Sequence, residues 1–337
     1  MRRPALTHIE ASHSIDPRTS CAEHCSLKVY REPSAAQWNR LQESAPENPF
    51  LTAAYAQARQ HLGETPVMLD QGGELCLGFL KRGRVTSGLQ VTSLAFTPSG
   101  EFLSGLADFC RDQRIYETAL GSFGSPALTI PRLPREIERR ARTEFLLDLS
   151  IPASQWKIGE THRRYIRRAE KSAVITRRIG VEGLADHLSM CRHSMSRRKV
   201  RGDAVPDVAD SPEFRSVVLQ GGGELFQAVR GSAVLSSILV IRSSSGAYYY
   251  SAGTNQEGME IGASHFLVHS VARSLQDEGL RTFNLGGAEV DNPGLRAFKS
   301  RFGATAVETE AVRAVLCGAF HRRLVEACHA LKRLGPG

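Results

Sequence analysis

RTFNLGGAEVDNPGLRAFKSRFGA, residues 281–304, decides the fold, because one short stretch supplies a strand, two glycines and a helix in succession. The apolar residues within Thr282–Leu285 predict a strand. Gly286-Gly287 follows as a predicted turn, where the absence of a Cβ atom lets a ligand approach the backbone closely. The stretch therefore predicts a binding site at the end of a strand.

A short helix is predicted over Pro293–Arg301, because Asn292 is a good N-cap residue and proline is favoured at the first helical position. The unpaired N–H groups at the start of this helix face the two glycines, an arrangement that binds anions. Lys299 and Arg301 add positive charge nearby. The alternative is a strand-to-helix connection that needs glycine for geometry and basic residues for solubility only.

The rest of the second half reads as an ordered series of helices and strands. The predicted helices are Ser154–Ala173, Val181–Arg197 and Ala263–Glu278, and the predicted strands are Val174–Ile179, Leu225–Arg230, Ala233–Arg242, Ala247–Ala252 and Ala306–Val315. The polar segment Arg197–Ser211 is expected to be a mobile loop.

The first half shows a comparable series. One helix is capped by Ser34 and reaches Ala45, and two more are predicted over Leu51–His61 and Glu101–Gln113. The predicted strands are Leu27–Arg31, Val67–Asp70, Leu75–Arg82, Val91–Phe96, Ala127–Ile130 and Glu144–Leu149.

Both halves thus order their elements alike, which predicts an α+β fold with a mixed sheet rather than the regular alternation of a doubly wound protein. We expect two related domains, residues 27–150 and 151–320, between a disordered leader (1–26) and a C-terminal helix or tail (321–337). The duplication is inferred from element order, since the halves share no literal sequence repeat.

The composition is that of a soluble globular protein, with 41% hydrophobic and 23% charged residues in a chain of 337. No apolar run approaches the roughly 18 residues that span a membrane, and the basic start has no apolar stretch behind it. These features predict a cytoplasmic protein. We expect no metal site, because Cys21, His24 and Cys25 lie in the leader and His265 and His269 lack a third ligand.

Positive charge gathers on one predicted helix. The net charge is +8, which favours anionic partners such as nucleic acid or phosphorylated cofactors. The sequence THRRYIRRAEK, residues 161–171, places an apolar stripe opposite its basic residues, which are Arg163, Arg164, Arg167, Arg168 and Lys171. Such a face suits phosphates. The alternative is an ordinary solvated helix surface.

Three consecutive tyrosines lie in a predicted strand, where alternation directs Tyr248 and Tyr250 to one face and Tyr249 to the other. A tyrosine hydroxyl on the site side can protonate a leaving group. The alternative is packing on the sheet. The sequence contains no Walker A motif, G-x-S-x-G elbow, H-E-x-x-H motif or Rossmann glycine fingerprint.

Two stretches, residues 145–174 and 248–304, resemble the GNAT superfamily, specifically its Fem-like and polysaccharide-associated acetyltransferase branch. The second is the more specific, because the strand–helix–strand–Gly-Gly–helix order and the ending FKSRFG match together. The resemblance spans roughly residues 28–315 and is weaker in the first half. It implies tandem GNAT-like domains.

The resemblance also implies transfer of an acyl or aminoacyl group to an amine. Fem-like relatives take the aminoacyl group from aminoacyl-tRNA. Lys299 matches the lysine of the FK-x-x-FG motif, and Arg163, Arg164 and Arg167 match the basic helix. One departure concerns acyl-CoA: GNAT enzymes that use it carry Q/R-x-x-G-x-G/A before the long helix, whereas QEGMEIGA (256–263) spaces its glycines differently.

We therefore predict an aminoacyltransferase in which an amine attacks the ester of aminoacyl-tRNA directly, with no bound cofactor. Backbone N–H groups near Ser251–Gly253 or Gly286-Gly287 meet the oxyanion, Lys299 holds the donor, and Tyr249 and Glu289 are candidates for proton transfer. Donor-phosphate binding is assigned to Gly286, Gly287, Arg301, Arg163, Arg164, Arg167 and Arg168. The alternatives are an acyl-CoA-dependent enzyme acting on a sugar or small amine, and a nucleic-acid-binding module without catalysis.

Overall fold

The computed structural model describes residues 26–83, 86–125, 128–202, 211–289 and 292–334. The predicted leader, with Cys21, His24 and Cys25, lies outside them except for its last residue, and so does most of the predicted loop Arg197–Ser211. The leader prediction is therefore untested, whereas the predicted loop begins too early, because residues 197–200 are the last turn of a helix that spans Leu184–Val200.

The first half contains three α-helices and six strands, counted over its described residues. In chain order they are β1 (Lys28–Tyr30), α1 (Ala35–Ser44), α2 (Ala53–His61), β2 (Thr65–Gln71), β3 (Glu74–Arg82), β4 (Ser87–Val91), α3 (Gly100–Asp112), β5 (Ile115–Gly121) and β6 (Glu136–Asp148), with a 3₁₀ turn at Pro49–Leu51.

The second half repeats this order with added helices. Its elements are α4 (Glu160–Lys171), β7 (Ile175–Ile179), α5 (Leu184–Val200), α6 (Pro212–Leu219), β8 (Gly223–Arg230), β9 (Ala233–Arg242), β10 (Gly246–Thr254), α7 (Gln256–Ile261), α8 (Ala263–Asp277), β11 (Thr282–Ala288), α9 (Pro293–Ser300), β12 (Thr305–Ala314) and α10 (Ala319–Leu334).

All of these strands join one mostly antiparallel sheet in the order β1-β2-β3-β4-β5-β12-β6-β11-β10-β9-β8-β7. Exchanging β1–β6 for β7–β12 reads this order backwards, so the two halves are related by an approximate two-fold symmetry. Each half has one parallel pair, β4–β5 and β10–β11. The α+β prediction, with a mixed sheet flanked by helices, is confirmed.

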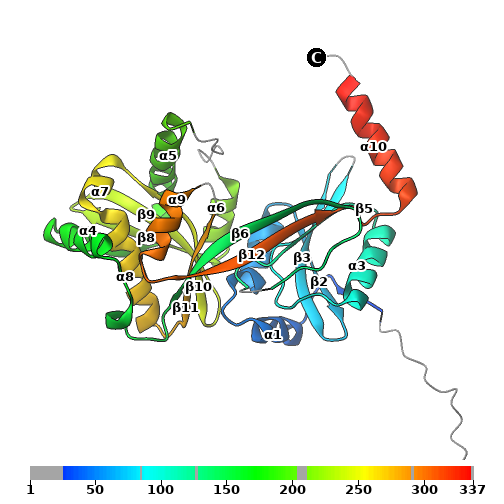
Figure 1. The fold of residues 1–337 in the computed structure, drawn as a ribbon, viewed down its shortest axis with the longest axis horizontal. Coiled ribbons are helices and arrows are strands. Elements are labelled where there is room, and N and C mark those ends of the chain that lie inside the picture. Colours follow the sequence, from blue (N-terminus) through cyan, green and yellow to red (C-terminus); the bar gives the residue numbers. More distant parts are fainter. Residues whose placement is uncertain (1–25, 84–85, 126–127, 203–210, 290–291, 335–337) are drawn as a thin grey trace, which may run out of the picture.

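The two long central strands exchange between the halves. β6 follows the first half in sequence yet pairs with β11 of the second, while β12 pairs with β5 of the first. Figure 1 shows β6 and β12 running side by side from one lobe to the other. A core cluster also spans both halves, with Leu41 and Phe50 packed in the same group as Leu188 and Tyr248. The boundary placed between residues 150 and 151 stays a prediction.

Most predicted elements are confirmed, but two strands are wrong. The strand expected over Val91–Phe96 is wrong, because β4 already ends at Val91. The strand that pairs in parallel with β4 is β5. Residues 128–130 form no strand, because side chains satisfy the backbone there. The Ile130 N–H donates to Glu310 Oε2 over 3.0 Å, and the Ile130 carbonyl accepts from Arg139 over 2.9 Å.

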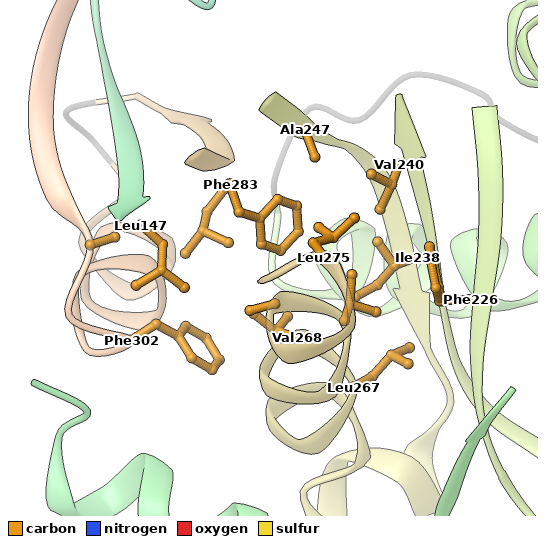
Figure 2. Close-up of a cluster of buried hydrophobic side chains, with 14 of the residues drawn as sticks. Leu147, Phe226, Ile238, Val240, Ala247, Leu267, Val268, Leu275, Phe283 and Phe302 are labelled. Atoms are coloured by element: carbon orange, nitrogen blue, oxygen red, sulfur yellow. The ribbon is translucent and has the colours of Figure 1, made fainter. Parts of the chain in front are cut away.

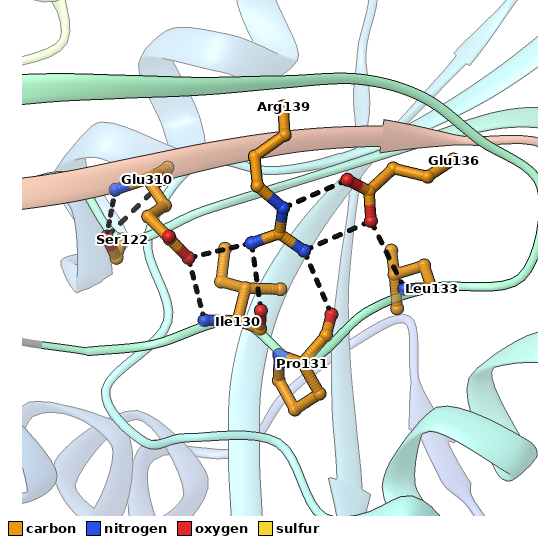
Figure 3. Close-up of polar contacts among 7 residues, drawn as sticks. All are labelled: Ser122, Ile130, Pro131, Leu133, Glu136, Arg139 and Glu310. Atoms are coloured by element: carbon orange, nitrogen blue, oxygen red, sulfur yellow. Dashed lines mark hydrogen bonds and ion pairs between the residues drawn. The ribbon is translucent and has the colours of Figure 1, made fainter.

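Arg139 links residues 130–131, which form no strand, to the central strands through hydrogen bonds (Figure 3). Its guanidinium donates to both carboxylate oxygens of Glu136, to Glu310 and to the carbonyls of Ile130 and Pro131, over 2.9–3.2 Å. These five hydrogen bonds use all five N–H donors of the guanidinium. The segment is therefore held without a strand partner.

The predicted turn at Gly286-Gly287 is also corrected. β11 runs through both glycines to Ala288, and its pairing with β6 shifts between Asn284 and Gly287. Gly286 has φ of +74°, a conformation that favours glycine. The irregularity therefore lies inside a strand.

Helix α8 is packed against the sheet of the second half. Its residues Leu267, Val268 and Leu275 contact side chains of β8–β11, and Phe302 and Leu147 close the cluster on the other side (Figure 2). The predicted apolar stripe on this helix is thus confirmed. The opposite face of β10 is covered by α5.

Gly253 of β10 touches α5 so closely that we expect Gly253→Ala to destabilise the fold. A Cβ atom there would lie 2.0 Å from the Met190 carbonyl carbon and 2.2 Å from the Cys191 nitrogen, both backbone atoms. The free energy of unfolding should fall by about 3 kcal/mol, measured by urea denaturation. Gly100→Ala is the control, because nothing lies within 4 Å of its Cβ position. An equal effect of both substitutions would contradict the described packing.

Candidate active site

The candidate site lies where β10 and β11 separate. The two strands pair in parallel only from Gly246 and Thr282 to Tyr248 and Asn284. Beyond that point β10 carries a bulge between Tyr249 and Ser251, and β11 carries the irregularity at Gly286. Polar side chains from β6, β10, β11 and α9 converge there.

Glu144 of β6 is the centre of a buried hydrogen-bond cluster. Its side chain is 1% exposed. Tyr248 donates its hydroxyl to Oε1 over 2.9 Å, while the Asn284 amide and the Gly124 N–H donate to Oε2 over 2.8 and 3.0 Å. A buried carboxylate needs such donors, because desolvation without them is costly. The cluster therefore joins residues from both halves of the chain.

Lys299 of α9 points into the same region. It is 6% exposed, and its Nζ donates to the Gly287 carbonyl over 2.7 Å. Burial first and the charge of Arg142 second lower the pKa of Lys299, and Glu144 opposes them, so that the pKa is about 7. Its Nζ and the Tyr248 hydroxyl lie 3.4 and 3.5 Å from the position that a Cβ of Gly286 would occupy. A side chain at residue 286 would separate these two groups.

Arg142 of β6 completes the cluster on the far side of Gly287. Its Nε would lie 1.8 Å from a Cβ at Gly287, so the guanidinium packs on the bare backbone. The guanidinium carbon is 5.4 Å from the centre of the Phe123 ring, within range of a cation–π contact. Nε is buried and has no hydrogen-bond partner among the described residues.

Two cavities flank Glu144. The first, of about 260 Å³, is here called the Glu47 cavity; it is lined by Glu47, Asn48, Ser125, Tyr248, Thr282 and Asn284 among others. The second, of about 280 Å³, is called the Arg142 cavity and is lined by Phe123, Glu138, Arg140, Arg142, Glu289 and Arg313 among others.

One face of β6 connects the two cavities. Its alternate residues 138, 140 and 142 line the Arg142 cavity and Leu146 lines the Glu47 cavity, with Glu144 between them. Residues 123–125 contribute to both cavities, because Phe123 lines the Arg142 cavity and Ser125 lines the Glu47 cavity. The Asn48 amide holds this segment by donating to Phe123 O over 3.2 Å and to Ser125 Oγ over 2.8 Å.

Several of the residues predicted from sequence are close together. Lys299 contacts Gly287 and lies 5.8 Å from the Tyr249 ring centre, and Gly286 adjoins both. Glu289 lines the Arg142 cavity. Arg301 lies elsewhere, where its carbonyl accepts from the Gly159 N–H over 2.7 Å at the start of α4. The catalytic and phosphate-binding roles of these residues stay predictions.

The tyrosine pattern is as predicted, but a different tyrosine is hydrogen-bonded in the cluster. Tyr248 and Tyr250 pack in the core shared by both halves, whereas Tyr249 packs beside α8. Burial is the main cause that raises the pKa of Tyr248 well above its ordinary value, and Glu144 raises it further. Tyr248 therefore stays protonated and donates to Glu144.

The basic face of α4 is exposed. Arg163, Arg164, Arg167 and Arg168 all face solvent. Glu160 pairs with Arg163 over 2.9 Å and with Arg167 over 3.0 Å, so the charge is offset more than the sequence 161–171 suggested.

The start of α4 is joined to α9, the helix that carries Lys299. His162 contacts the Phe298 carbonyl over 2.8 Å, next to Lys299 in sequence. His265 of α8 stacks on Tyr165 at 4.6 Å, and burial lowers the pKa of His265 to about 4. His162, His265 and Tyr165 thus pack the three helices together.

The segment QEGMEIGA forms helix α7 and the bend before α8. Gly258 abuts the Leu235 carbonyl, 2.4 Å from its Cβ position, and Gly262 abuts the Tyr165 carbonyl at 2.7 Å. Both glycines are therefore used for packing between elements.

Sequence reasoning missed Glu144, Arg142, Tyr248 and Asn284 as site residues. One signal was present: Glu144 is a charged residue at the head of the apolar run FLLDL. The partners of that carboxylate come from distant parts of the chain, so only the sheet order shows that they meet.

Among the described residues, no group of three or more His, Cys, Asp or Glu side chains could hold a metal ion. Within the same residues, each helix is too short or too polar to cross a membrane.

Comparison with known proteins identifies the domain. Residues 157–300 match the family described as "Acetyltransferase (GNAT) domain". Three solved structures resemble most of the chain. They are FemX (12% identity, 84% of this chain and 96% of that chain, TM-score 0.62), the tandem GNAT protein from the clavulanic acid biosynthesis pathway (11%, 87% and 100%, 0.51) and L-PGS from Bacillus licheniformis (12%, 90% and 98%, 0.50). Comparison with curated protein sequences gives no significant match.

Residues 157–300 therefore form a GNAT domain, which supports an acyltransferase. The overall fold of the chain is shared with Fem-like and tandem GNAT proteins, as the sequence resemblance implied.

Proposed function

We propose that the protein transfers an aminoacyl group from aminoacyl-tRNA to an amine by direct attack. The observation that carries this proposal is the buried Lys299, placed against the Gly287 carbonyl where β10 and β11 separate. The likeness to FemX over most of both chains supports it.

The reaction exchanges one bond for another. The amine nitrogen attacks the carbonyl carbon of the ester that links the amino acid to the terminal ribose. The tetrahedral intermediate collapses, the carbon–oxygen bond to the ribose breaks, and the proton lost by nitrogen ends on the ribose oxygen. The products are an amide and a free ribose hydroxyl.

Lys299 is suited to stabilise the oxyanion of that intermediate. An ammonium group has three donors, and only one is used by the Gly287 carbonyl. The ammonium form is present at and below neutral pH, because the pKa of Lys299 is about 7, and a cation held in a buried site stabilises developing negative charge more strongly than it would in water. The Gly286 N–H, one of the backbone donors predicted for this task, instead donates to Asn284 Oδ1 over 2.8 Å.

Tyr248 is better placed than Tyr249 to move the proton, because Glu144 orients its hydroxyl beside Lys299. A hydroxyl that both donates and accepts can pass a proton from the attacking nitrogen to the leaving oxygen. Glu144 acts here as a positioning residue. The reaction needs no resident cofactor, and a tRNA donor implies a cytoplasmic protein.

Two features favour aminoacyl-tRNA over acyl-CoA. The segment expected to hold the pyrophosphate of acyl-CoA is the packed helix α7, with Gly262 against Tyr165. The exposed arginines of α4 supply a surface for tRNA phosphates instead. Acyl-CoA remains the alternative donor.

Arg164→Glu/Arg168→Glu should weaken tRNA binding, because these two arginines are exposed and lie outside the ion pairs with Glu160. We expect the affinity for labelled tRNA to fall about 10- to 100-fold at 50 mM salt. The slope of log K against log salt should become shallower by about 2, or roughly one for each lost phosphate contact.

The charge-matched control is Lys81→Glu/Arg82→Glu, which changes two exposed residues of the first half. It alters the net charge equally, so it should leave the affinity within about threefold of the unmodified protein. If both double variants weaken binding alike, the effect is one of net charge and α4 is not the tRNA surface.

A further inference from the structure

We infer that the Glu47 cavity binds the acceptor as a small organic ammonium ion. The inference rests on the proposed function, because it names the substrate class for the amine side of that reaction. It concerns a cavity between the two halves of the chain, with one wall from residues 44–49 and the other from β10 and β11.

The charge of the cavity is opposite to that of the protein. The described residues of its lining include one carboxylate, Glu47, and no lysine, arginine or histidine, in a chain whose net charge is +8. Arg281 approaches Glu47 only to 3.9 Å, and its side chain is 69% exposed. An ammonium ion is the ligand that such a lining favours, because opposite charge lowers its free energy there.

Glu47 is held in place while remaining open to solvent. Thr282 donates its hydroxyl to Glu47 Oε2 over 2.6 Å, and the Glu47 side chain is 42% exposed. The other carboxylate oxygen, Oε1, has only the Arg281 Nε beside it, at 3.9 Å in an exposed ion pair, so a ligand ammonium group can compete for it. A carboxylate with one fixed oxygen and one available oxygen can orient a small cation.

Uncharged polar groups complete the lining. Asn48, Ser125 and Asn284 present amide and hydroxyl groups, each within a network of hydrogen bonds. Their fixed positions suit a ligand that carries hydroxyl groups as well as an amine, such as an amino sugar or an amino alcohol. The volume of about 260 Å³ limits the ligand to roughly the size of a monosaccharide or smaller.

The cavity leads to the proposed reaction centre. Tyr248 and Asn284 line it and also donate to Glu144. The Tyr248 hydroxyl and Lys299 Nζ lie within 3.5 Å of one point above Gly286. The bound ammonium ion must first lose its extra proton to solvent, and the neutral amine can then react beside Tyr248, which lines the same cavity.

The Arg142 cavity differs from the Glu47 cavity in the charges that line it. Its lining holds three arginines and two glutamates. Arg140 and Arg313 form ion pairs with Glu138, and Arg142 is not part of those pairs. Ammonium ions should therefore prefer the Glu47 cavity.

The test is equilibrium binding, measured by calorimetry on the full chain with pairs of probes that differ in charge. The pairs are D-glucosamine and D-glucose, ethanolamine and ethylene glycol, and 1,4-diaminobutane and 1,4-butanediol. We expect at least one ammonium probe to bind roughly tenfold more tightly than its neutral partner. Glu47→Gln should remove that difference while retaining the acceptor for Thr282.

Glu43→Gln is the matched control, because Glu43 is an exposed glutamate of α1 outside the cavity lining. It should leave the preference unchanged. The inference is overturned if no ammonium probe binds more tightly than its neutral partner, or if both glutamine variants lose the preference alike.

Because the binding assay contains no tRNA, its outcome is independent of the proposed reaction. Transfer from aminoacyl-tRNA with no preference for ammonium would leave the proposed function standing and remove the cavity assignment. A clear preference for the ammonium probes without any aminoacyl transfer would support the cavity assignment and remove the proposed function.

Discussion

Lys299→Met is expected to lower the rate of aminoacyl transfer by about 10²- to 10³-fold, because it removes the fixed donor proposed for the oxyanion. Methionine fills a similar volume, so the packing of α9 on β11 should be retained. The rate is measured in a single turnover with excess protein, which separates chemistry from product release. Affinity for tRNA should not change, because Lys299 is buried, whereas the arginines proposed to bind tRNA are exposed on α4.

Lys81→Met controls for the loss of a lysine, since Lys81 is exposed on β3. It should leave the rate unchanged. If Lys299→Met transfers the aminoacyl group as fast as the unmodified protein, Lys299 has no role in the chemistry.

The pH dependence of stability gives the same variant a second readout. The pKa of Lys299 is about 7 in the folded protein, below its ordinary value of 10.5. Between these values the unfolded chain binds more protons than the folded one, so the free energy of unfolding rises with pH from about 7. Lys299→Met should lose this contribution, which is at most ~1.36 kcal/mol per pH unit. Urea unfolding at pH 7, 8 and 9 measures it, and an unchanged slope would argue against a lowered pKa.

Glu144→Leu is expected to destabilise the protein by about 3–5 kcal/mol. The substitution leaves three buried donors, from Tyr248, Asn284 and Gly124, without an acceptor. Glu144→Gln should cost only about 1 kcal/mol, because its amide oxygen can serve Asn284 and Gly124 while its amide nitrogen donates to Tyr248. Urea denaturation measures both.

Glu308→Leu is the control on the neighbouring strand β12, where the glutamate is exposed and accepts one bond from Thr143. Its effect should stay within about 0.5 kcal/mol. Equal stability of the Glu144→Leu and Glu308→Leu variants would show that the buried cluster contributes nothing to the fold.

Local sequence signals predicted most of the fold. The capping residues Ser34 and Asn292 begin helices as expected, since their side chains accept from backbone N–H groups three residues on. The stripe on α8 and the hairpin of β2 and β3 follow from periodicity and a glycine turn. Errors arose where tertiary contacts replace local pairing, as at Ile130, whose backbone bonds to side chains.

The site was predicted only where its residues are close in sequence. Lys299 and the two glycines come from one stretch, and their meeting follows from a strand and the next helix. Glu144 joins them because β6 crosses to the second half and pairs with β11. The exchange of β6 and β12 between the halves depends on the packing of the whole sheet, so no local sequence pattern predicts it.

The most direct test is a single-turnover assay with total tRNA charged with radiolabelled amino acids, mixed with the protein and a primary amine such as D-glucosamine. Aminoacyl esters are hydrolysed by mild base, whereas amides are stable, so product is counted as base-stable label attached to the amine. We expect base-stable label with the unmodified protein and almost none with Lys299→Met. Absence of such label with every charged amino acid, together with acylation of the same amine from acetyl-CoA, would contradict aminoacyl-tRNA as the donor.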